Sequence, residues 1–269
     1  MVADAEGSLS NVEKKTAMFE KEIGAGIGKN VDRILRGRSD WRGKTVVDLA
    51  CGDGRTTYVL RNLGADVRPY DILPERCKLE DGAQYADIME GLPIESDSVD
   101  VVILQEVIEH LPNHLSALQE ICRILKPGGE LFLTTPNRSS LASKLAYLFF
   151  ESEILRGTPP SAMESVWGES GDKRYYGHLF LMGAQQLRTL SMLAGFSSME
   201  VHRTEKSTSS QWLMLPLYPA LLGISYRAYR RAVRKSKSHA YASEKMAQLK
   251  LNVVGRVLTN KFLIASLRK

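Results

Sequence analysis

The stretch Lys44-Thr45-Val46-Val47-Asp48-Leu49-Ala50-Cys51-Gly52-Asp53-Gly54 joins a short apolar run to a turn that contains two glycines. The apolar run predicts a β-strand, and residues 55–63 predict a helix that ends at Gly64. Glycine lets the backbone bend sharply and leaves no Cβ between the main chain and a ligand. The segment therefore predicts a strand, turn and helix with a ligand held against the turn.

Further strands and helices alternate along the chain. Residues 99–104 are almost entirely apolar, which is typical of a strand buried on both faces of a parallel sheet. A helix over 115–125 is expected to stop at Lys126-Pro127-Gly128-Gly129. Other strands are predicted at 65–71, 83–87, 130–135, 198–203 and 262–267. This alternation predicts an α/β fold, a doubly wound, seven-stranded and mostly parallel sheet with helical insertions.

The remaining segments define the expected domain organisation. Residues 1–40 predict N-terminal helices, and residues 41–204 together with 259–269 form the predicted core. An insertion over 137–182 is expected to cover the active site. A second insertion, 205–258, is hydrophobic and basic and precedes the last strand.

The composition is that of an ordinary globular protein, with 43% hydrophobic residues, 25% charged residues and a formal net charge of +5. The apolar run 212–224 contains Pro216 and Pro219, and it is shorter than the roughly 18 to 20 residues that cross a bilayer. Residues 1–10 lack the apolar core of a signal peptide. The three cysteines show no pairing or metal spacing. We expect a cytoplasmic protein.

The glycine turn alone does not separate two classes of nucleotide-binding fold. Thr57 stands where the dinucleotide fingerprint has its third glycine or alanine. Asp71 ends the second strand, where a carboxylate can accept ribose hydroxyls, and Asp87 ends the third, where it can accept the adenine amine. With Glu106-Val107-Ile108-Glu109-His110 and Leu125-Lys126-Pro127-Gly128-Gly129, these residues resemble the class I S-adenosylmethionine-dependent methyltransferases over residues 44–135.

This resemblance implies the Rossmann-like class I methyltransferase fold, S-adenosylmethionine as cofactor and S-adenosylhomocysteine as its product. The positions that it assigns to the cofactor are Asp48, Ala50, Gly52, Gly54, Asp71, Ile72, Asp87, Ile88 and Gln105. The turn would line the methionine part, and Asp71 would bind the ribose. Ile72 would pack on the adenine, Asp87 and Ile88 would hold its edge, and the Gln105 backbone would help to fix the amino acid moiety. The competing interpretation is that Asp71 and Asp87 only form turns at strand ends.

Methyl transfer from a sulfonium is an in-line displacement, so aligning the acceptor with the methyl group supplies much of the acceleration. A hydroxyl acceptor must also lose its proton, and histidine is a suitable base near neutral pH. His110, which follows the fourth strand, is the first catalytic candidate, His178 is the second, and Glu109 is placed with them. In the competing interpretation His110 is a hydrogen-bonded structural residue.

Glu106, Glu109 and His110 are also similar to the metal-ligating set of the ubiquinone-biosynthesis O-methyltransferases. Two carboxylates and one imidazole would suit magnesium or zinc, and a metal could acidify the acceptor hydroxyl. Many similar methyltransferases carry the same segment with no known metal. A divalent metal therefore stays an alternative, and no metal ligand is assigned.

The motifs after the strands bear on the class of methyl acceptor. Residues 105–108 are not the (Asp/Asn)-Pro-Pro-aromatic loop of adenine methyltransferases, and a Pro-Cys nucleophile is absent, so nucleic acid is not expected. Thr135-Pro136-Asn137, residues 175–180 and the second insertion resemble small methyltransferases of bacterial polysaccharide biosynthesis. That resemblance implies O-methylation of a sugar hydroxyl in a polysaccharide or lipid-linked glycan. The alternatives are a quinone or phenolic lipid-like acceptor and, from another class, a non-catalytic S-adenosylmethionine-binding regulator.

Residues 211–237 join an apolar, aromatic-bearing segment to a basic helix predicted at Tyr226–Lys237. Such a segment suits an interfacial anchor on an anionic membrane, which would place the protein peripherally at the inner membrane. It suits equally an apolar lid over the acceptor, with the arginines solvated. Both interpretations stay open, and the sequence does not determine the oligomeric state.

Overall fold

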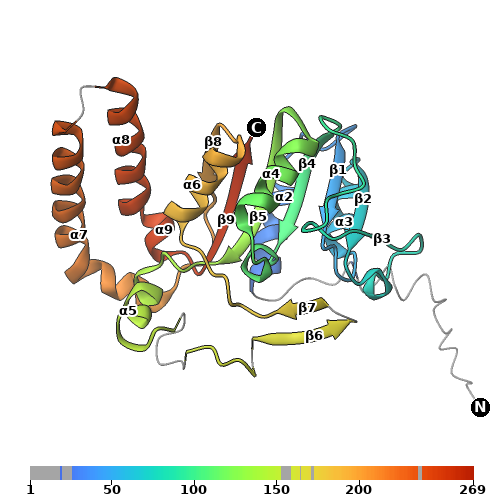
Figure 1. The fold of residues 1–269 in the computed structure, drawn as a ribbon, viewed down its shortest axis with the longest axis horizontal. Coiled ribbons are helices and arrows are strands. Elements are labelled where there is room, and N and C mark those ends of the chain that lie inside the picture. The colour runs from blue at the N-terminus through green and yellow to red at the C-terminus, as the bar shows by residue number, and fades with distance from the viewer. Residues whose placement is uncertain (1–18, 20–25, 153–158, 164, 171–172, 236–237) are drawn as a thin grey trace, which may run out of the picture.

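The computed structural model describes residues 19, 26–152, 159–163, 165–170, 173–235 and 238–269. Its centre is a seven-stranded sheet with the strand order β3-β2-β1-β4-β5-β9-β8 (Figure 1). The strands of this sheet are β1 (Thr45–Leu49), β2 (Asp66–Asp71), β3 (Gln84–Tyr85), β4 (Val99–Gln105), β5 (Leu125–Pro136), β8 (Ser198–Val201) and β9 (Phe262–Arg268). The first five run parallel, and β9 lies antiparallel between β5 and β8. The predicted doubly wound fold is confirmed.

Alternate side chains of the strands enter two apolar cores, one on each face of the sheet. Val47, Leu104 and Leu131 face the larger core, which α4 (His114–Ile124) and α6 (Ala184–Ala194) cover. Val46 and Phe132 face the smaller core, which α2 (Ile27–Arg36) and α3 (Arg55–Asn62) cover. Because neighbouring residues of a strand point to opposite faces, apolar runs on β1, β4 and β5 fill both cores. The sheet is thereby fixed as the middle layer of three.

The structure shifts some of the predicted boundaries. Strand β5 begins at Leu125, five residues before the predicted strand at 130–135, because Leu125 pairs with Val99 before the register shifts to Glu130 opposite Val101. Gly128 has a φ of 80° within this irregularity, so its left-handed turn forms within β5. Strand β3 spans only two residues of the predicted 83–87.

The first insertion contains α5 (Leu141–Phe150) and a two-stranded antiparallel hairpin of β6 (Val166–Ser170) and β7 (Lys173–Tyr176). This hairpin was not predicted. Figure 1 shows it crossing the end of the sheet at which the parallel strands finish. Of the two predicted leading helices, α2 is present, and the first lies almost entirely outside the described residues.

The second insertion consists of α7 (Thr208–Arg234), α8 (His239–Val253) and the short α9 (Gly255–Thr259). The apolar segment and the basic helix, predicted as separate pieces, are one continuous helix of 27 residues with Pro216 and Pro219 inside it. Proline removes a helical hydrogen bond and bends a helix, and Figure 1 shows α7 changing direction between its first turns and its long straight part. Among the described residues, no helix is long and apolar enough to cross a membrane.

Candidate active site

The glycine turn and the segment after β4 leave the sheet side by side. Strands β1 and β4 are parallel neighbours, with Leu49 opposite Leu104. Ala50, Gly52 and Gly54 have φ values of 58°, 57° and 90°, so the turn passes through the left-handed region three times. Gly54 then caps the N-terminus of α3. In open α/β sheets this carboxyl edge is where ligands bind.

The two glycines of the turn do different things. A Cβ at Gly52 would meet nothing within 4 Å, so the space above this residue is open to a ligand. A Cβ at Gly54 would lie 2.6 Å from Cγ of Leu79, because the segment after β2 folds back over the turn and Lys78 N donates to Asp53 O. Gly52 thus borders an open space, which we call the cradle, while Gly54 is required by packing against the protein itself.

Asp71 is buried at the end of β2 and is joined directly to the turn. Its Oδ2 accepts from Gly52 N at 2.9 Å, and its Oδ1 accepts from Leu73 N at 2.8 Å. Each carboxylate oxygen can accept a second hydrogen bond, so ribose hydroxyls could still be bound. Asp71 therefore forms a turn at the end of β2, and it also lies beside the open space at Gly52.

Asp87 repeats this turn one strand further out. Its Oδ1 accepts from Met89 N at 2.9 Å, the same two-residue spacing as between Asp71 and Leu73. Ile88 is buried beside it, and Ile72 is half-buried. β2 and β3 are parallel neighbours, so both acids follow the ends of adjacent strands at one edge of the sheet.

Asp48 was also expected to contact the cofactor, and in the structure its side chain is hydrogen-bonded to Thr57. Its Oδ2 accepts from Thr57 Oγ1 at 2.7 Å, and both residues are fully buried. Burial raises the pKa of Asp48 to about 7, against the lowering effect of the Thr57 hydrogen bonds. Thr57 therefore links the strand to the first turn of α3 at the position where the dinucleotide fingerprint has a small residue.

Gln105 ends β4 and reaches across to the same helix. Its Nε2 donates to Thr56 Oγ1 at 2.8 Å, which ties the end of β4 to the first turn of α3. The next residue, Glu106, has a φ of 51°, so the chain turns sharply out of the sheet immediately after Gln105. This turn directs the following residues over the carboxyl edge.

The catalytic candidates lie together after this turn. His110 ends the short 3₁₀ helix η2 (Ile108–His110), and its ring contacts that of His178 with centroids 5.1 Å apart. His110 Nδ1 lies 2.7 Å from Tyr176 O, and Phe180 N donates to Glu109 O at 3.0 Å. These two hydrogen bonds fasten the segment after β7 to η2, which explains how residues so far apart in sequence meet.

The hydrogen bond to Tyr176 also assigns the tautomer of His110. A carbonyl oxygen only accepts, so Nδ1 carries the proton and Nε2 of the neutral ring keeps its lone pair. Burial, with a smaller contribution from His110, lowers the pKa of His178, which favours its neutral form near pH 7. Both rings can therefore accept a proton or bind a cation.

The two glutamates of the segment are placed differently. Glu109 is fully buried, and its Oε2 accepts from Thr135 Oγ1 at 3.0 Å. Potential ligand atoms of Glu109, His110 and His178 all lie within 4.8 Å of one another. Glu106 instead accepts from Thr134 Oγ1, and its pKa is raised to about 7 by burial and by the nearby Glu109. The sequence suggested Glu106, Glu109 and His110 as a possible metal-ligating set. In the structure the group consists of Glu109, His110 and His178.

Sequence reasoning did not identify Thr56, Thr57, Leu79 and Tyr176, which hold the site together. Each acts through a contact with a residue distant in the chain, as in the pairs of Gln105 with Thr56 and His110 with Tyr176. Thr57 alone carried a sequence clue, because a hydroxyl residue replaced the expected small one. The other three stand in positions with no local pattern.

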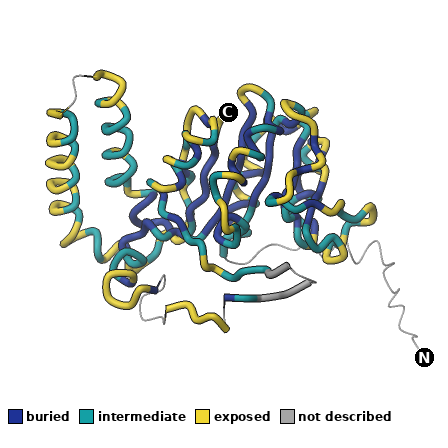
Figure 2. The backbone as a smooth tube through the Cα atoms, viewed as in Figure 1, coloured by how far each residue is buried: buried dark blue, intermediate teal, exposed yellow. Residues whose placement is uncertain are grey.

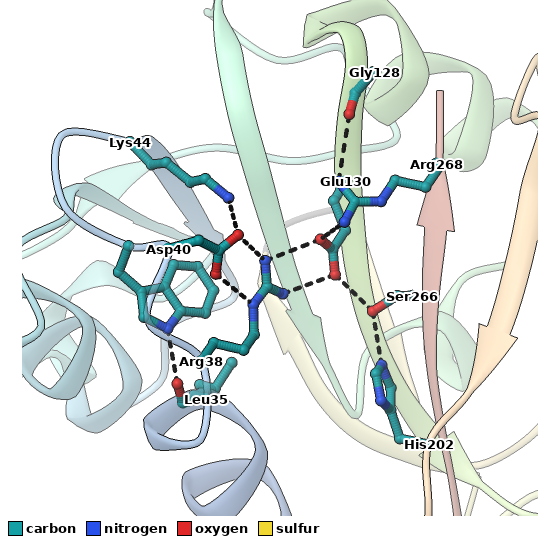
Figure 3. Close-up of polar contacts among 10 residues, drawn as sticks. Leu35, Arg38, Asp40, Lys44, Gly128, Glu130, His202, Ser266 and Arg268 are labelled. Carbon is teal, nitrogen blue, oxygen red and sulfur yellow. Dashed lines mark hydrogen bonds and ion pairs between the residues drawn. The ribbon is translucent and has the colours of Figure 1, made fainter.

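A second polar cluster lies at the opposite edge of the sheet (Figure 3). Glu130, at the register shift of β5, accepts from Arg38 Nη1 at 2.8 Å and from Ser266 Oγ at 2.6 Å, and it pairs with Arg268 at 3.0 Å. Ser266 Oγ in turn lies 2.8 Å from His202 Nε2. Since the Ser266 proton points to Glu130, His202 Nε2 donates to the serine. This cluster lines a cavity of about 330 Å³ and joins four segments of the chain.

The seven-stranded sheet, the open glycine cradle and the acids that end β2 and β3 together define a class I S-adenosylmethionine-dependent methyltransferase. The chain belongs to the methyltransferase-domain family, whose model matches residues 19–201. The site residues fit the cofactor because the space over Gly52 is open and a buried carboxylate borders it.

The chain is also similar to curated O-methyltransferases. The ubiquinone biosynthesis O-methyltransferase of Xanthomonas oryzae is 37% identical over 119 residues, covering 40% of this chain and 50% of the relative. The human mitochondrial ubiquinone biosynthesis O-methyltransferase is 31% identical over 152 residues, covering 48% of this chain and 41% of the relative. The chain thus spans about half the length of the curated relatives that it matches.

Solved structures share the fold at low sequence identity. An S-adenosylmethionine-dependent methyltransferase from Archaeoglobus fulgidus aligns with a TM-score of 0.51 and 15% identity, covering 91% of this chain and 95% of that one. A phosphoethanolamine N-methyltransferase from Haemonchus contortus, in complex with S-adenosylhomocysteine, aligns with a TM-score of 0.50 and 17% identity. It covers 94% of this chain and 56% of that one.

Proposed function

We propose that the protein methylates a hydroxyl group of a quinol or phenol that carries an apolar substituent. The observation that carries this proposal is the contact of His110 with His178 after β4, beside the cofactor turn. A hydroxyl acceptor needs a base, and two imidazoles able to accept a proton lie there. The curated relatives are ubiquinone O-methyltransferases, which favours this acceptor over the sugar hydroxyl of a polysaccharide.

Each residue of the cluster has a defined task in this proposal. The cofactor, when bound, supplies a methyl group on a positively charged sulfur. Nε2 of His110 takes the proton of the acceptor hydroxyl, while the Tyr176 carbonyl holds the ring in that tautomer. The buried Glu109 carboxylate stabilises the imidazolium that forms, because opposite charges within a few ångströms favour the charged state.

Purified protein with radiolabelled cofactor tests the acceptor directly. The panel contains a quinol with an isoprenoid tail, the same headgroup without the tail, and a lipid-linked glycan. We expect label in the tailed quinol, with a lower rate for the tail-less headgroup. Label in the glycan alone would contradict the proposal and support the polysaccharide interpretation. Binding of the cofactor without transfer to any of the three would support the non-catalytic regulator.

A divalent cation is a second use of the same cluster. Glu109, His110 and His178 offer one carboxylate and two imidazoles, a donor set that suits zinc or a similar cation. Such a cation would acidify a bound hydroxyl and take over the task of the base. Chelation with EDTA followed by dialysis separates the two mechanisms. Activity that is lost and then restored by a metal salt supports the cation, and unchanged activity supports His110 as base.

A further inference from the structure

Large apolar side chains are exposed on two helices of the insertions. Leu148 and Phe149 of α5 are 73% and 66% exposed, and Trp212, Leu215 and Ile224 of α7 are 71%, 74% and 68% exposed. We name these five side chains the α5–α7 surface. Single exposed apolar residues are common, but several on two adjoining helices are typical of an interaction site.

The fold brings the two helices together. Ala142 N in the first turn of α5 donates to Ser210 Oγ in the first turn of α7 at 3.1 Å, and Ser210 is fully buried. Figure 1 shows α5 beside the lower end of α7, on the side of the sheet where the β6–β7 hairpin lies. The exposed side chains therefore belong to neighbouring elements.

The apolar side chains of α7 do not serve to hold the helix in the protein. A different side of α7 packs on α8, where Asn252 Nδ2 donates to Ser225 Oγ at 2.7 Å. Figure 2 shows exposed residues along the outer side of α7 and intermediate ones on the side toward α8. The outer side is thus available for a partner, and the contact with α8 stays intact while it is occupied.

The charges on these helices are of one sign. Neither α5 nor α7 contains an aspartate or glutamate, and α7 has no charged residue before Arg227. Its last turns then carry Arg227, Arg230, Arg231 and Arg234. An apolar face followed by cations fits an interface in which acyl chains lie next to anionic headgroups.

We propose that the α5–α7 surface docks the protein onto anionic lipid bilayers. The apolar side chains of α5 and of the part of α7 before Arg227 enter the boundary between headgroups and acyl chains, and the four arginines bind lipid phosphates. No described helix can span the bilayer, so the protein lies on it. The docking does not depend on the identity of the acceptor.

Vesicle flotation of the full chain, without cofactor or acceptor, tests this proposal. We expect the protein to float with vesicles of phosphatidylcholine and phosphatidylglycerol, and to do so far less with phosphatidylcholine alone. Replacing Trp212, Leu215 and Ile224 with serine should weaken binding by up to about a thousandfold, since each buried apolar side chain is worth about a factor of ten. Replacing Arg227 and Arg230 with glutamine should reduce binding about fivefold per cation and weaken its salt dependence.

Matched variants separate docking from general effects. Leu193→Ser changes a leucine of α6 that is 65% exposed outside the surface, and Arg68→Gln changes an exposed arginine of β2. Both should float as the unchanged protein does. A blue shift of tryptophan fluorescence on vesicle addition should become smaller in Trp212→Phe, because Trp212 is exposed on the surface while Trp41 is already buried.

Three outcomes would overturn the proposal. The first is that the protein does not float with anionic vesicles. The second is that the serine variant floats as well as the unchanged protein does. The third is that the protein binds neutral and anionic vesicles equally. Light scattering provides the remaining check. A dimer that becomes a monomer in the serine variant, together with no vesicle binding, would assign the surface to a second copy of the chain.

Discussion

At the scale of single residues, the candidate site depends on hydrogen bonds between segments distant in the chain, such as that of His110 Nδ1 with Tyr176 O. Asp71 and Asp87 follow strand ends, so their position at one edge of the sheet could be predicted from hydrophobic patterning. The contact of His110 with His178 could not, because it depends on hydrogen bonds to Tyr176 O and from Phe180 N across an unpredicted hairpin. Local patterns contain no information on such pairs.

Replacing His110 with alanine should lower turnover by about 10² to 10⁴, the usual contribution of a general base. Cofactor affinity should be unchanged, because the ring makes its contacts with Tyr176 and His178 and not with the glycine turn. Calorimetric titration with S-adenosylhomocysteine and a single-turnover assay measure the two quantities separately. His239→Ala, an exposed histidine of α8, is the control. Equal turnover in both variants would exclude His110 as the base.

Asp48 should make stability depend on pH. Its pKa is raised to about 7 by burial, so the folded state retains its proton where the unfolded chain, with a carboxyl pKa near 4, has lost it. The free energy of unfolding should therefore fall as the pH rises from about 4 to about 7 and level off above.

Asp48→Asn preserves an oxygen for the Thr57 hydroxyl and cannot ionise. Urea unfolding at pH 5 and pH 8 measures how far the free energy of unfolding falls between these pH values. This fall should be smaller by about 2 kcal/mol in the variant than in the unchanged protein. Asp66→Asn, at an exposed position of β2, should leave the difference unchanged. An identical pH dependence in Asp48→Asn and the unchanged protein would contradict the assignment.

At the scale of elements, β1, β4 and β9 have strong apolar patterns and were predicted within a residue of their bounds, while β5 begins five residues early at its register shift. β4 has that pattern, whereas β3 does not, and only Gln84 and Tyr85 of its predicted residues pair. The β6–β7 hairpin and the continuity of α7 were missed for one reason. Tertiary contacts override local preference, so two prolines that predict a break lie within a helix whose other side packs on α8.

The glycine turn gives a prediction in three matched variants. Gly52, Gly54 and Gly128 all have positive φ, so alanine at any of them should cost about 1–2 kcal/mol of stability. Only Gly54→Ala adds a clash, with Leu79, and should be the least stable in urea unfolding. Only Gly52→Ala places a methyl group in the open cradle, so it should lose cofactor affinity beyond its stability cost. Equal cofactor affinities in Gly52→Ala and Gly128→Ala would contradict a cofactor site at the cradle.

At the scale of the whole molecule, the Glu130 cluster joins the segment before β1 to β5, β9 and the end of β8. Glu130 is 2% exposed and contacts two arginines, which are themselves 19% and 50% exposed. Glu130→Gln should lower the free energy of unfolding by about 1–3 kcal/mol, because it weakens hydrogen bonds to charged groups without leaving a fully buried charge unpaired. Glu200→Gln, at an exposed pair with Arg256, should change it by less than about 0.5 kcal/mol. Similar denaturation midpoints for the two variants would contradict this role.

The position of β9 between β5 and β8 has a consequence for synthesis on the ribosome. β8 is translated well before its partner, because all of α7, α8 and α9 come first. A nascent chain that has released only its first five strands therefore exposes an unpaired edge of β5, the kind of edge that invites aggregation. Translational pausing within the helical insertion should prolong this exposure and raise the demand for chaperones.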